Sequence, residues 1–262
     1  TQNYLSNPEA NITLVNAPSL WGMGYTGQGV VVASMDSGVD LSHPDLSSRW
    51  RGGTNSWYDP YGQHPATPTD KTGHGTWTMG VMVGGDAGGT SIGVAPDAQW
   101  IAVKIFDDRG QATTTAIHQG FQWLLDPDGA PATADAPHVV NNSWSGLDID
   151  PWFIPYVLAW RAAGIFPAFS AGNYGPNCGT LGEPGAYQES FASAAHDLNE
   201  LEYSTGSRGP SYWGDEPYTK PNLSAPGVNI ISSSFFADDA YAPMSGTSMS
   251  SPHVAGAVVL LW

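Results

Sequence analysis

Short apolar runs rich in β-branched residues recur along the chain, and each is bounded by glycine, proline, aspartate or serine. Runs of this length between turn-forming residues are typical of β-strands. We predict strands at residues 29–35, 100–106, 138–143, 165–170 and 228–232.

The segments between several of these runs have the spacing of helices. We predict helices at residues 113–125, at 151–163, where Gly164 is well placed to end the helix, and from Thr247 onward. Alternating strands and helices predict an α/β fold with a mostly parallel central sheet flanked by helices.

No internal repeat, low-complexity tract or charge block marks a linker, so we predict one domain over residues 1–262. The loops at 50–73 and 172–187 are rich in Gly, Pro, Asn, Asp and Tyr. Long loops of a parallel sheet tend to border the functional crevice, so we expect them near the site.

The composition narrows the classes of function. Eight Lys and Arg against 24 Asp and Glu leave a net charge of −16, which disfavours partners such as nucleic acid or an anionic membrane. No run approaches the ~18 apolar residues of a membrane span. A single cysteine, Cys178, excludes an intrachain disulfide.

Three segments carry candidate chemistry. Ser248 follows a Gly-Thr turn and begins an apolar, small-residue helix, a place suited to a nucleophile. A serine hydroxyl needs a base within hydrogen-bond reach and a third group that orients the base. His74 lies between two glycines, and Asp36 follows the first predicted strand. The chain order Asp, His, Ser is that of subtilisin, not of chymotrypsin or the α/β-hydrolases.

The sequence around these residues strengthens this interpretation. It reads Met-Asp-Ser-Gly-Val-Asp at 35–40, His-Gly-Thr at 74–76, and Gly-Thr-Ser-Met-Ser-Ser-Pro-His-Val-Ala-Gly at 246–256. Over residues 26–262 the chain resembles the subtilisin-like serine peptidases (subtilases). Within that family it is most similar to the bacillopeptidase F-like members, through the segments 92–96, 139–144 and 165–173.

The resemblance implies a three-layer subtilisin-like fold and a secreted, extracellular serine endopeptidase. Its partners would be polypeptide substrates and an inhibitory propeptide, and we expect a monomer. Ser248 would be the nucleophile, His74 the general base and acid, and Asp36 the group that orients His74. Asn173 would donate to the oxyanion, together with the Ser248 N–H.

Substrate-binding residues are expected on two segments that flank an extended peptide. The first specificity pocket would lie between the second segment and Gly182, whose lack of a side chain predicts an open floor and a preference for a large apolar or aromatic residue before the scissile bond. The two segments are Gly110, Gln111 and Ala112, and Ser143, Trp144, Ser145 and Gly146.

The chain departs from the family pattern in some places. Ser145 stands where many members have glycine. Asp45 matches a family calcium ligand, but Ala87 lacks the side-chain amide of another, so structural calcium is left open, no metal ligand is assigned, and no cofactor is required for catalysis. Because the chain stops at Trp262 inside the last predicted helix, we expect the final C-terminal elements of the domain to be missing.

Other classes fit less well. A Gly-x-Gly-x-x-Gly match at 22–27 precedes the first strand, whereas a dinucleotide-binding fingerprint must follow a strand. No Gly-x-Ser-x-Gly or His-Glu-x-x-His motif occurs, which argues against an α/β-hydrolase or a zinc peptidase. A catalytically silent member of the same fold, acting as a binding scaffold, is the main alternative.

Overall fold

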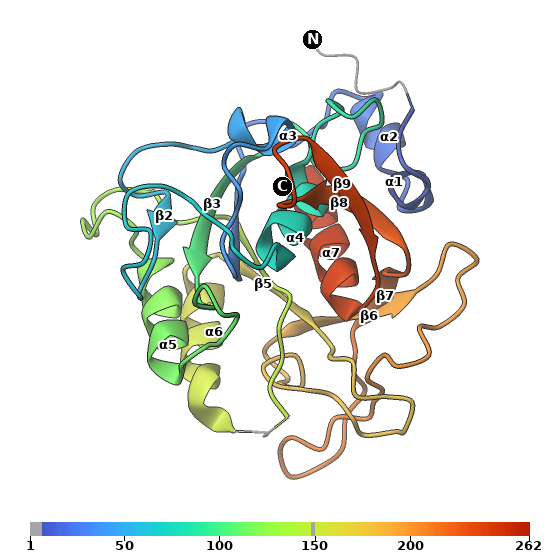
Figure 1. Cartoon of the computed structure of the whole chain (residues 1–262). Coiled ribbons are helices and arrows are strands. Elements are labelled where there is room, and N and C mark those ends of the chain that lie inside the picture. The colour runs from blue at the N-terminus through green and yellow to red at the C-terminus, as the bar shows by residue number, and fades with distance from the viewer. Residues whose placement is uncertain (1–6, 148–149) are drawn as a thin grey trace.

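A seven-stranded parallel sheet forms the centre of the protein, seen in a computed structural model that describes residues 7–147 and 150–262 (Figure 1). Its strand order is β2-β3-β1-β4-β5-β6-β7, and every neighbouring pair is parallel. The strands are β1 (Val31–Asp36), β2 (Trp57–Tyr58), β3 (Gln99–Lys104), β4 (Val139–Asn142), β5 (Phe166–Ser170), β6 (Phe191–His196) and β7 (Leu223–Pro226).

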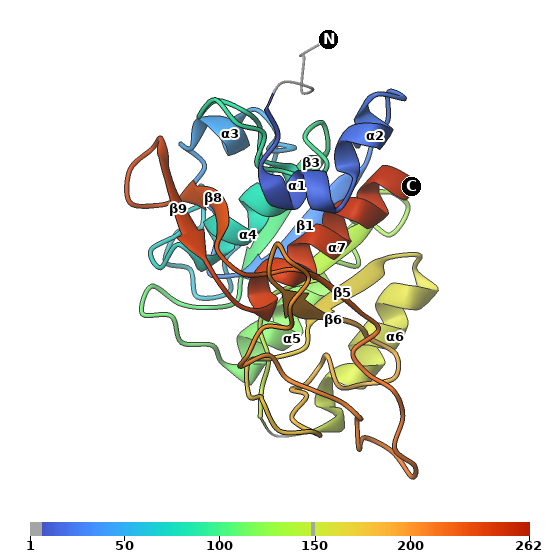
Figure 2. The same cartoon turned by 90° about the vertical axis from the view of Figure 1, so that its right-hand side faces the viewer.

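Helices cover both faces of this sheet. One face packs against α4 (His74–Val83) and α7 (Thr247–Leu261), and the other against α5 (Thr114–Trp123) and α6 (Ile154–Ala162) (Figures 1 and 2). Side chains alternate along each strand, so Val32 belongs to the core under α4 and α7 while Ala33 belongs to the core under α5. These layers form the predicted three-layer α/β fold.

The remaining elements lie around these layers. The antiparallel pair β8 (Ile230–Ser234) and β9 (Ala240–Met244) packs against α4. Short helical segments complete the described elements: α1 (Ala10–Leu14), α2 (Ala17–Trp21), α3 (Pro44–Ser47) and the 3₁₀ turn η1 (Pro151–Phe153). In the part of the chain that the structure describes, no helix has both the length and the apolar character that crossing a membrane requires.

The hydrophobic pattern predicted four strands of the central sheet, β1, β3, β4 and β5, within a few residues. The predicted strand at 228–232 overlaps β8, which belongs to the separate antiparallel pair. The pattern missed β6, whose sequence Phe-Ala-Ser-Ala-Ala-His has few large apolar residues, and β7, which contains a serine and a proline. Small residues suit β6 because α7 packs directly against it.

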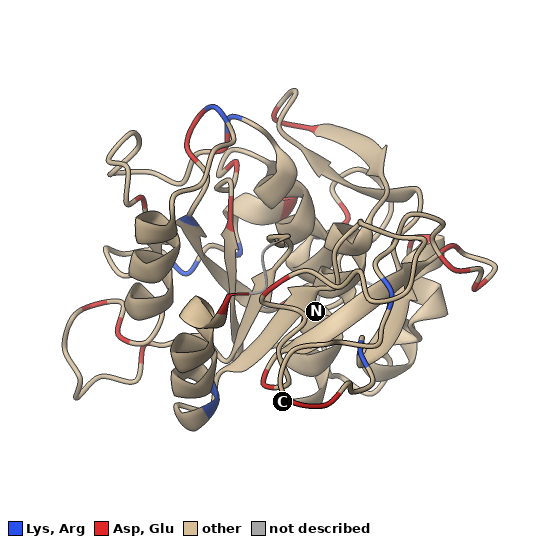
Figure 3. Ribbon diagram, turned by 90° about the horizontal axis from the view of Figure 1, so that it is seen from below, with Lys and Arg blue, Asp and Glu red and all other residues tan. Residues whose placement is uncertain are grey.

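The excess negative charge is spread over the molecule. Acidic residues lie on loops on all sides of the view in Figure 3, and basic residues are few.

Candidate active site

Asp36 is the last residue of β1, so the strand delivers its carboxylate to the carboxyl edge of the sheet, where α/β folds place functional groups. The side chain is 1% exposed. Its Oδ1 accepts a hydrogen bond from the backbone N–H of Ser37 at 2.7 Å. A buried carboxylate requires partners of this kind, and a second partner comes from the next element of the site.

His74 is the first residue of α4 and meets Asp36 directly. Its Nδ1 lies 2.8 and 2.9 Å from the two carboxylate oxygens. Gly75 makes this approach feasible, since a Cβ there would lie 2.1 Å from the carbonyl oxygen of Gly38. The bond at Nδ1 leaves Nε2 without a hydrogen-bond partner among the described residues, and the His74 side chain is 32% exposed. Nε2 is therefore available to a reacting group.

Asp70 holds the turn that precedes His74, a role that the sequence analysis missed. Its Oδ1 accepts from the N–H groups of Thr72 and Gly73, at 3.0 and 2.8 Å, and its Oδ2 accepts from the N–H and the hydroxyl of Thr76. The Thr76 N–H is one of the unpaired N–H groups in the first turn of α4, which a carboxylate can cap. An aspartate three residues before the glycine that precedes α4 was the available signal.

The environment raises the pKa of His74. Burial alone lowers the pKa of the imidazole, but the charge and hydrogen bond of Asp36, together with the charge of Asp70, outweigh this effect. Opposite charges favour the imidazolium, which is the form that a general base reaches when it accepts a proton. The pair is thus arranged to orient His74 and to stabilise its protonated form.

Ser248 lies in the first turn of α7, after a turn that requires glycine. Gly246 has φ +149°, and a Cβ there would lie 3.4 Å from the side chain of Asn173. The Ser248 hydroxyl donates to the carbonyl oxygen of Ser143 at 3.0 Å, and the Ser143 hydroxyl donates to the carbonyl oxygen of Ser248 at 2.7 Å. Within the described part of the chain, Ser248 makes no hydrogen bond to His74. A rotation of the serine side chain away from Ser143 is therefore needed for proton transfer.

Asn173 follows β5 and lies against the same turn. Its Oδ1 accepts from the N–H and the hydroxyl of Thr247, at 2.9 and 3.0 Å. Because the amide oxygen is held in this way, the Nδ2 donor faces away from Thr247, and Gly246 leaves space beside it. The structure brings Asn173 and Ser248 together as neighbours of a single turn.

A cavity of about 370 Å³ opens beside His74 and Asp36. It brings His74 and Asp36 together with Gly110 and with Ser143, Trp144 and Ser145, as the predicted substrate segments require. The side chain of Trp144 packs on the core rings of Phe121 and Phe169, so its contribution to the cavity comes with a fixed backbone.

Gln111 and Ala112 do not line this cavity. The carbonyl oxygen of Gln111 accepts from the N–H of Asp107 at 2.9 Å, and Ala112 bridges to Phe106 in antiparallel fashion. One edge of this predicted substrate segment is therefore already paired within the protein, and Gly110 is its member that lines the cavity with His74.

The prediction of an open pocket floor at Gly182 is wrong. A Cβ at Gly182 would lie 2.9 Å from Cε2 of Tyr174, 2.8 Å from Cβ of Ser145 and 2.7 Å from the carbonyl oxygen of Gly146. The absent side chain is thus replaced by the ring of another residue, which sequence patterns could not place. The preference for a large apolar or aromatic residue rested on that floor and loses its basis.

The loop that would hold the family's calcium ion has other partners. Asp45 Oδ1 accepts from the N–H of Ala87 at 2.8 Å, and Oδ2 accepts from the hydroxyl of Tyr241 at 2.6 Å. A Cβ at Gly85 would lie 2.7 Å from the guanidinium of Arg49 and 2.8 Å from Asp45 Oδ1. Calcium takes six to eight oxygen ligands, and these residues supply hydrogen-bond donors and a cation instead, so they do not fit the ion.

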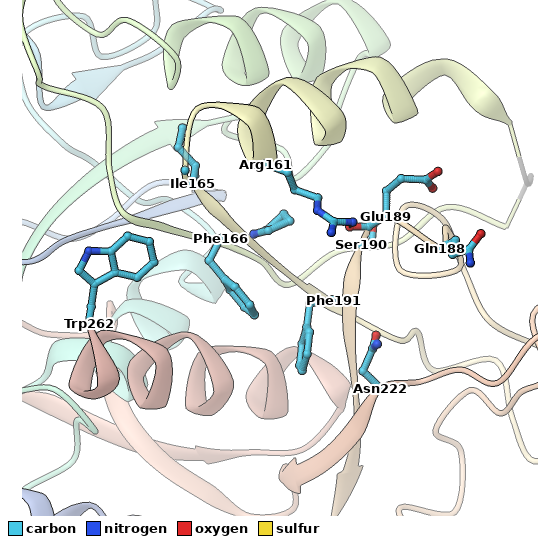
Figure 4. A pocket seen from close by; sticks show the side chains of 11 residues that line it. Arg161, Ile165, Phe166, Gln188, Glu189, Ser190, Phe191, Asn222 and Trp262 are labelled. Carbon is cyan, nitrogen blue, oxygen red and sulfur yellow. The ribbon is translucent and has the colours of Figure 1, made fainter.

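A second hollow, of about 360 Å³, lies at the opposite edge of the sheet (Figure 4). It is lined at the start of β5 and β6 by Phe166 and Phe191, with Arg161 and Trp262 nearby. The Arg161 guanidinium donates to the carbonyl oxygen of Glu189 at 3.2 Å. None of the predicted site residues reaches this hollow, so it is separate from the candidate active site.

Known proteins resemble the chain over nearly its whole length. The model of the Subtilase family matches residues 27–262. Bacillopeptidase F of Bacillus subtilis is 42% identical over 97% of this chain, and subtilisin E of the same species is 32% identical over 98%. The major intracellular serine protease of B. subtilis is 30% identical over 95%.

The lengths of these relatives differ from that of the chain. It spans 19% of bacillopeptidase F, 62% of subtilisin E and 73% of the major intracellular serine protease. The predicted likeness to bacillopeptidase F is confirmed by the identity over the shared region.

Proposed function

This chain belongs to the subtilase family, and on that premise we propose that it is a serine endopeptidase that hydrolyses polypeptides through an acyl-enzyme on Ser248. The observation that carries the proposal is the pair formed by His74 and Asp36 at 2.8 Å, which lines a cavity together with Ser143. The carbonyl oxygen of Ser143 accepts the hydrogen bond of the Ser248 hydroxyl. One of its relatives is named a serine protease, which supports peptide-bond hydrolysis by a serine nucleophile.

The proposed reaction begins when a peptide carbonyl enters the cavity beside His74. The Ser248 hydroxyl leaves the Ser143 carbonyl, gives its proton to Nε2 of His74, and its oxygen attacks the carbonyl carbon. Asp36 keeps the proton of Nδ1 in place and stabilises the imidazolium. His74 then donates its proton to the leaving amine. In the second half of the reaction, water gives a proton to His74 and attacks the acyl-enzyme. The Ser248 oxygen leaves and takes the proton back from His74, which releases the carboxylic acid product.

The developing oxyanion needs donors that are already oriented. Nδ2 of Asn173 is one, because Thr247 fixes the other end of the amide. The backbone N–H of Ser248 is the second, since the first N–H groups of a helix have no partner within it. We therefore assign Asn173 and the Ser248 N–H to the oxyanion hole.

Substrate would bind as an extended chain along Ser143, Trp144 and Ser145 on one side and Gly110 on the other. Main-chain pairing of this kind accepts many sequences, so we propose an endopeptidase with little selectivity at the substrate positions held by main-chain pairing alone. Secretion, an inhibitory propeptide and a monomeric state stay predictions, and one relative is named an intracellular protease.

The test is hydrolysis of an unstructured protein such as β-casein, followed by mass spectrometry of the products. We expect internal cleavage by the wild-type chain and none by Ser248→Ala at equal concentration and equal thermal stability. Intact casein with both proteins, alongside a folded wild type, would favour the silent binding scaffold.

A further inference from the structure

We propose that the ring of Tyr174 occupies the pocket for the residue before the scissile bond, so that this chain cleaves after small residues such as alanine. The proposal rests on the endopeptidase function proposed above and specifies its substrate class. Two segments form the walls of this pocket, one at Ser145 and Gly146 and the other at Gly182 and Glu183.

The two walls of this pocket are joined at one end. The N–H of Gly146 donates to the carbonyl oxygen of Glu183 at 2.9 Å, and the N–H of Glu183 donates back to Gly146 at 3.2 Å. Gly182 precedes this bridge, and its N–H donates to the carbonyl oxygen of Ala171, next to the end of β5. The space enclosed by Ser145, Gly146 and Gly182 is therefore narrow and has a fixed backbone.

Tyr174 spans that space. On the distal edge of the ring, Cε2 lies 2.9 Å from the Cβ position of Gly182. At the tip of the same ring, the phenol donates to the carbonyl oxygen of Ser145 at 2.9 Å and accepts from the Ser145 hydroxyl at 3.2 Å. The N–H of Tyr174 donates to the hydroxyl of Ser207 at 3.0 Å, which anchors the backbone of Tyr174.

The position of Tyr174 in the chain ties it to the reaction. It directly follows Asn173, whose amide is assigned to the oxyanion hole. The residue that carries the scissile carbonyl would therefore bind next to Tyr174. A small side chain on that side of the substrate leaves the ring in place. A phenylalanine side chain needs the volume that the ring fills, and its entry breaks the hydrogen bonds of the phenol to Ser145.

The experiment compares peptide p-nitroanilides that differ only in alanine or phenylalanine before the scissile bond. We expect the wild type to favour alanine at least tenfold in kcat/KM, which is within the range that a few buried methylene groups command. Tyr174→Ala should raise the phenylalanine to alanine ratio at least tenfold. Tyr174→Leu should give an intermediate ratio, and it guards against a failure of the alanine variant to fold.

Tyr174→Phe is the matched control, because it keeps the ring and removes only the phenol hydroxyl. We expect its phenylalanine to alanine ratio to rise less than that of Tyr174→Ala, because the ring still fills the pocket and only the hydrogen bonds of the phenol are lost. A wild type that cleaves after phenylalanine as fast as after alanine, or an unchanged ratio in Tyr174→Ala and Tyr174→Leu, would overturn the proposal.

A binding measurement separates this proposal from the proposed function. In the Ser248→Ala background, calorimetry compares product peptides that end in alanine or phenylalanine. Absence of hydrolysis in every variant would refute the endopeptidase function. The calorimetric comparison would still show whether Tyr174 fills the pocket. Tighter binding of the alanine peptide, reversed by Tyr174→Ala, supports the ring as the pocket filler, and equal binding contradicts it.

Discussion

Replacing Asn173 tests whether an oriented amide stabilises the transition state. Its Oδ1 accepts two hydrogen bonds from Thr247, so only the Nδ2 end is free for substrate. Asn173→Asp keeps an acceptor for both Thr247 donors and removes the NH₂ group. Asn173→Ala removes both ends. The two variants therefore separate the donor from the support that it receives.

The expected magnitudes follow from these contacts. Loss of one oxyanion donor costs about 10²–10³ in kcat, or about 2.7–4 kcal/mol, a value measured in the relative subtilisin. We expect at least this loss in Asn173→Asp, because a negative charge would then face the oxyanion. Thr247 is fully buried, so Asn173→Ala should also lower the free energy of unfolding by about 1–3 kcal/mol, whereas Asn173→Asp should change it less.

The assay is steady-state hydrolysis of a peptide p-nitroanilide, with chemical denaturation run in parallel. We expect kcat to fall in both variants while KM changes little, because the donor acts on the transition state and not on the bound substrate. A fall in kcat of less than tenfold in both variants, or an effect confined to KM, would refute this role of Asn173.

Three further predictions concern pH and metal. His74 must be neutral to accept a proton, and its pKa is raised, so kcat/KM should fall as the pH drops through a value above 6.5. Asp36→Asn should move the midpoint of this pH profile down and lower kcat by about 10⁴-fold. An unmoved midpoint would count against the pairing of His74 with Asp36. Burial, opposed by the bond to a helix carbonyl, lowers the pKa of His253 to about 4, so the unfolded chain binds more protons than the folded one between about pH 6.5 and 4. Stability should therefore be lost as the pH falls through that window, by up to about 3 kcal/mol, and His253→Gln should flatten the slope in denaturation curves, whereas an equal slope would contradict the assignment. A chelator should leave Tm unchanged, and a Tm that rises with added calcium would show that the loop binds the ion. Tyr241→Phe should lower the free energy of unfolding by about 2 kcal/mol, because it removes the hydrogen bond to Asp45.

The central layers could be predicted from the sequence because their signals are local. β1, β3 and β5 are largely apolar, and β4 begins with two valines; such strands in alternation with helices leave few arrangements. β6 could not be found in this way, since its small side chains are selected by the approach of α7, which is a tertiary contact. The strand at 230–234 was found, but its pairing with β9 depends on a turn and not on its own composition.

In the candidate site, too, local signals could be predicted from the sequence and tertiary contacts could not. Asp36 and His74 could be paired from the sequence because each follows a recognisable strand or glycine turn and their order is diagnostic. Two contacts could not be predicted from the sequence: the hydrogen bond from the Ser248 hydroxyl to Ser143, and the packing of the Tyr174 ring against Gly182. Both depend on side-chain torsions and on segments far apart in the chain. The wrong prediction for the pocket floor came from reading Gly182 without its spatial neighbours.

Covalent labelling with a fluorophosphonate decides whether Ser248 is an activated nucleophile. Intact-mass measurement should show one phosphonyl group on the wild type, and peptide mapping should place it on Ser248. Ser248→Ala should remain unlabelled, and His74→Ala should label at least 10²-fold more slowly, because the serine then lacks its base. A folded wild type that stays unlabelled, or that labels no faster than Ser248→Ala, would contradict the assignment of Ser248, His74 and Asp36 as one catalytic unit.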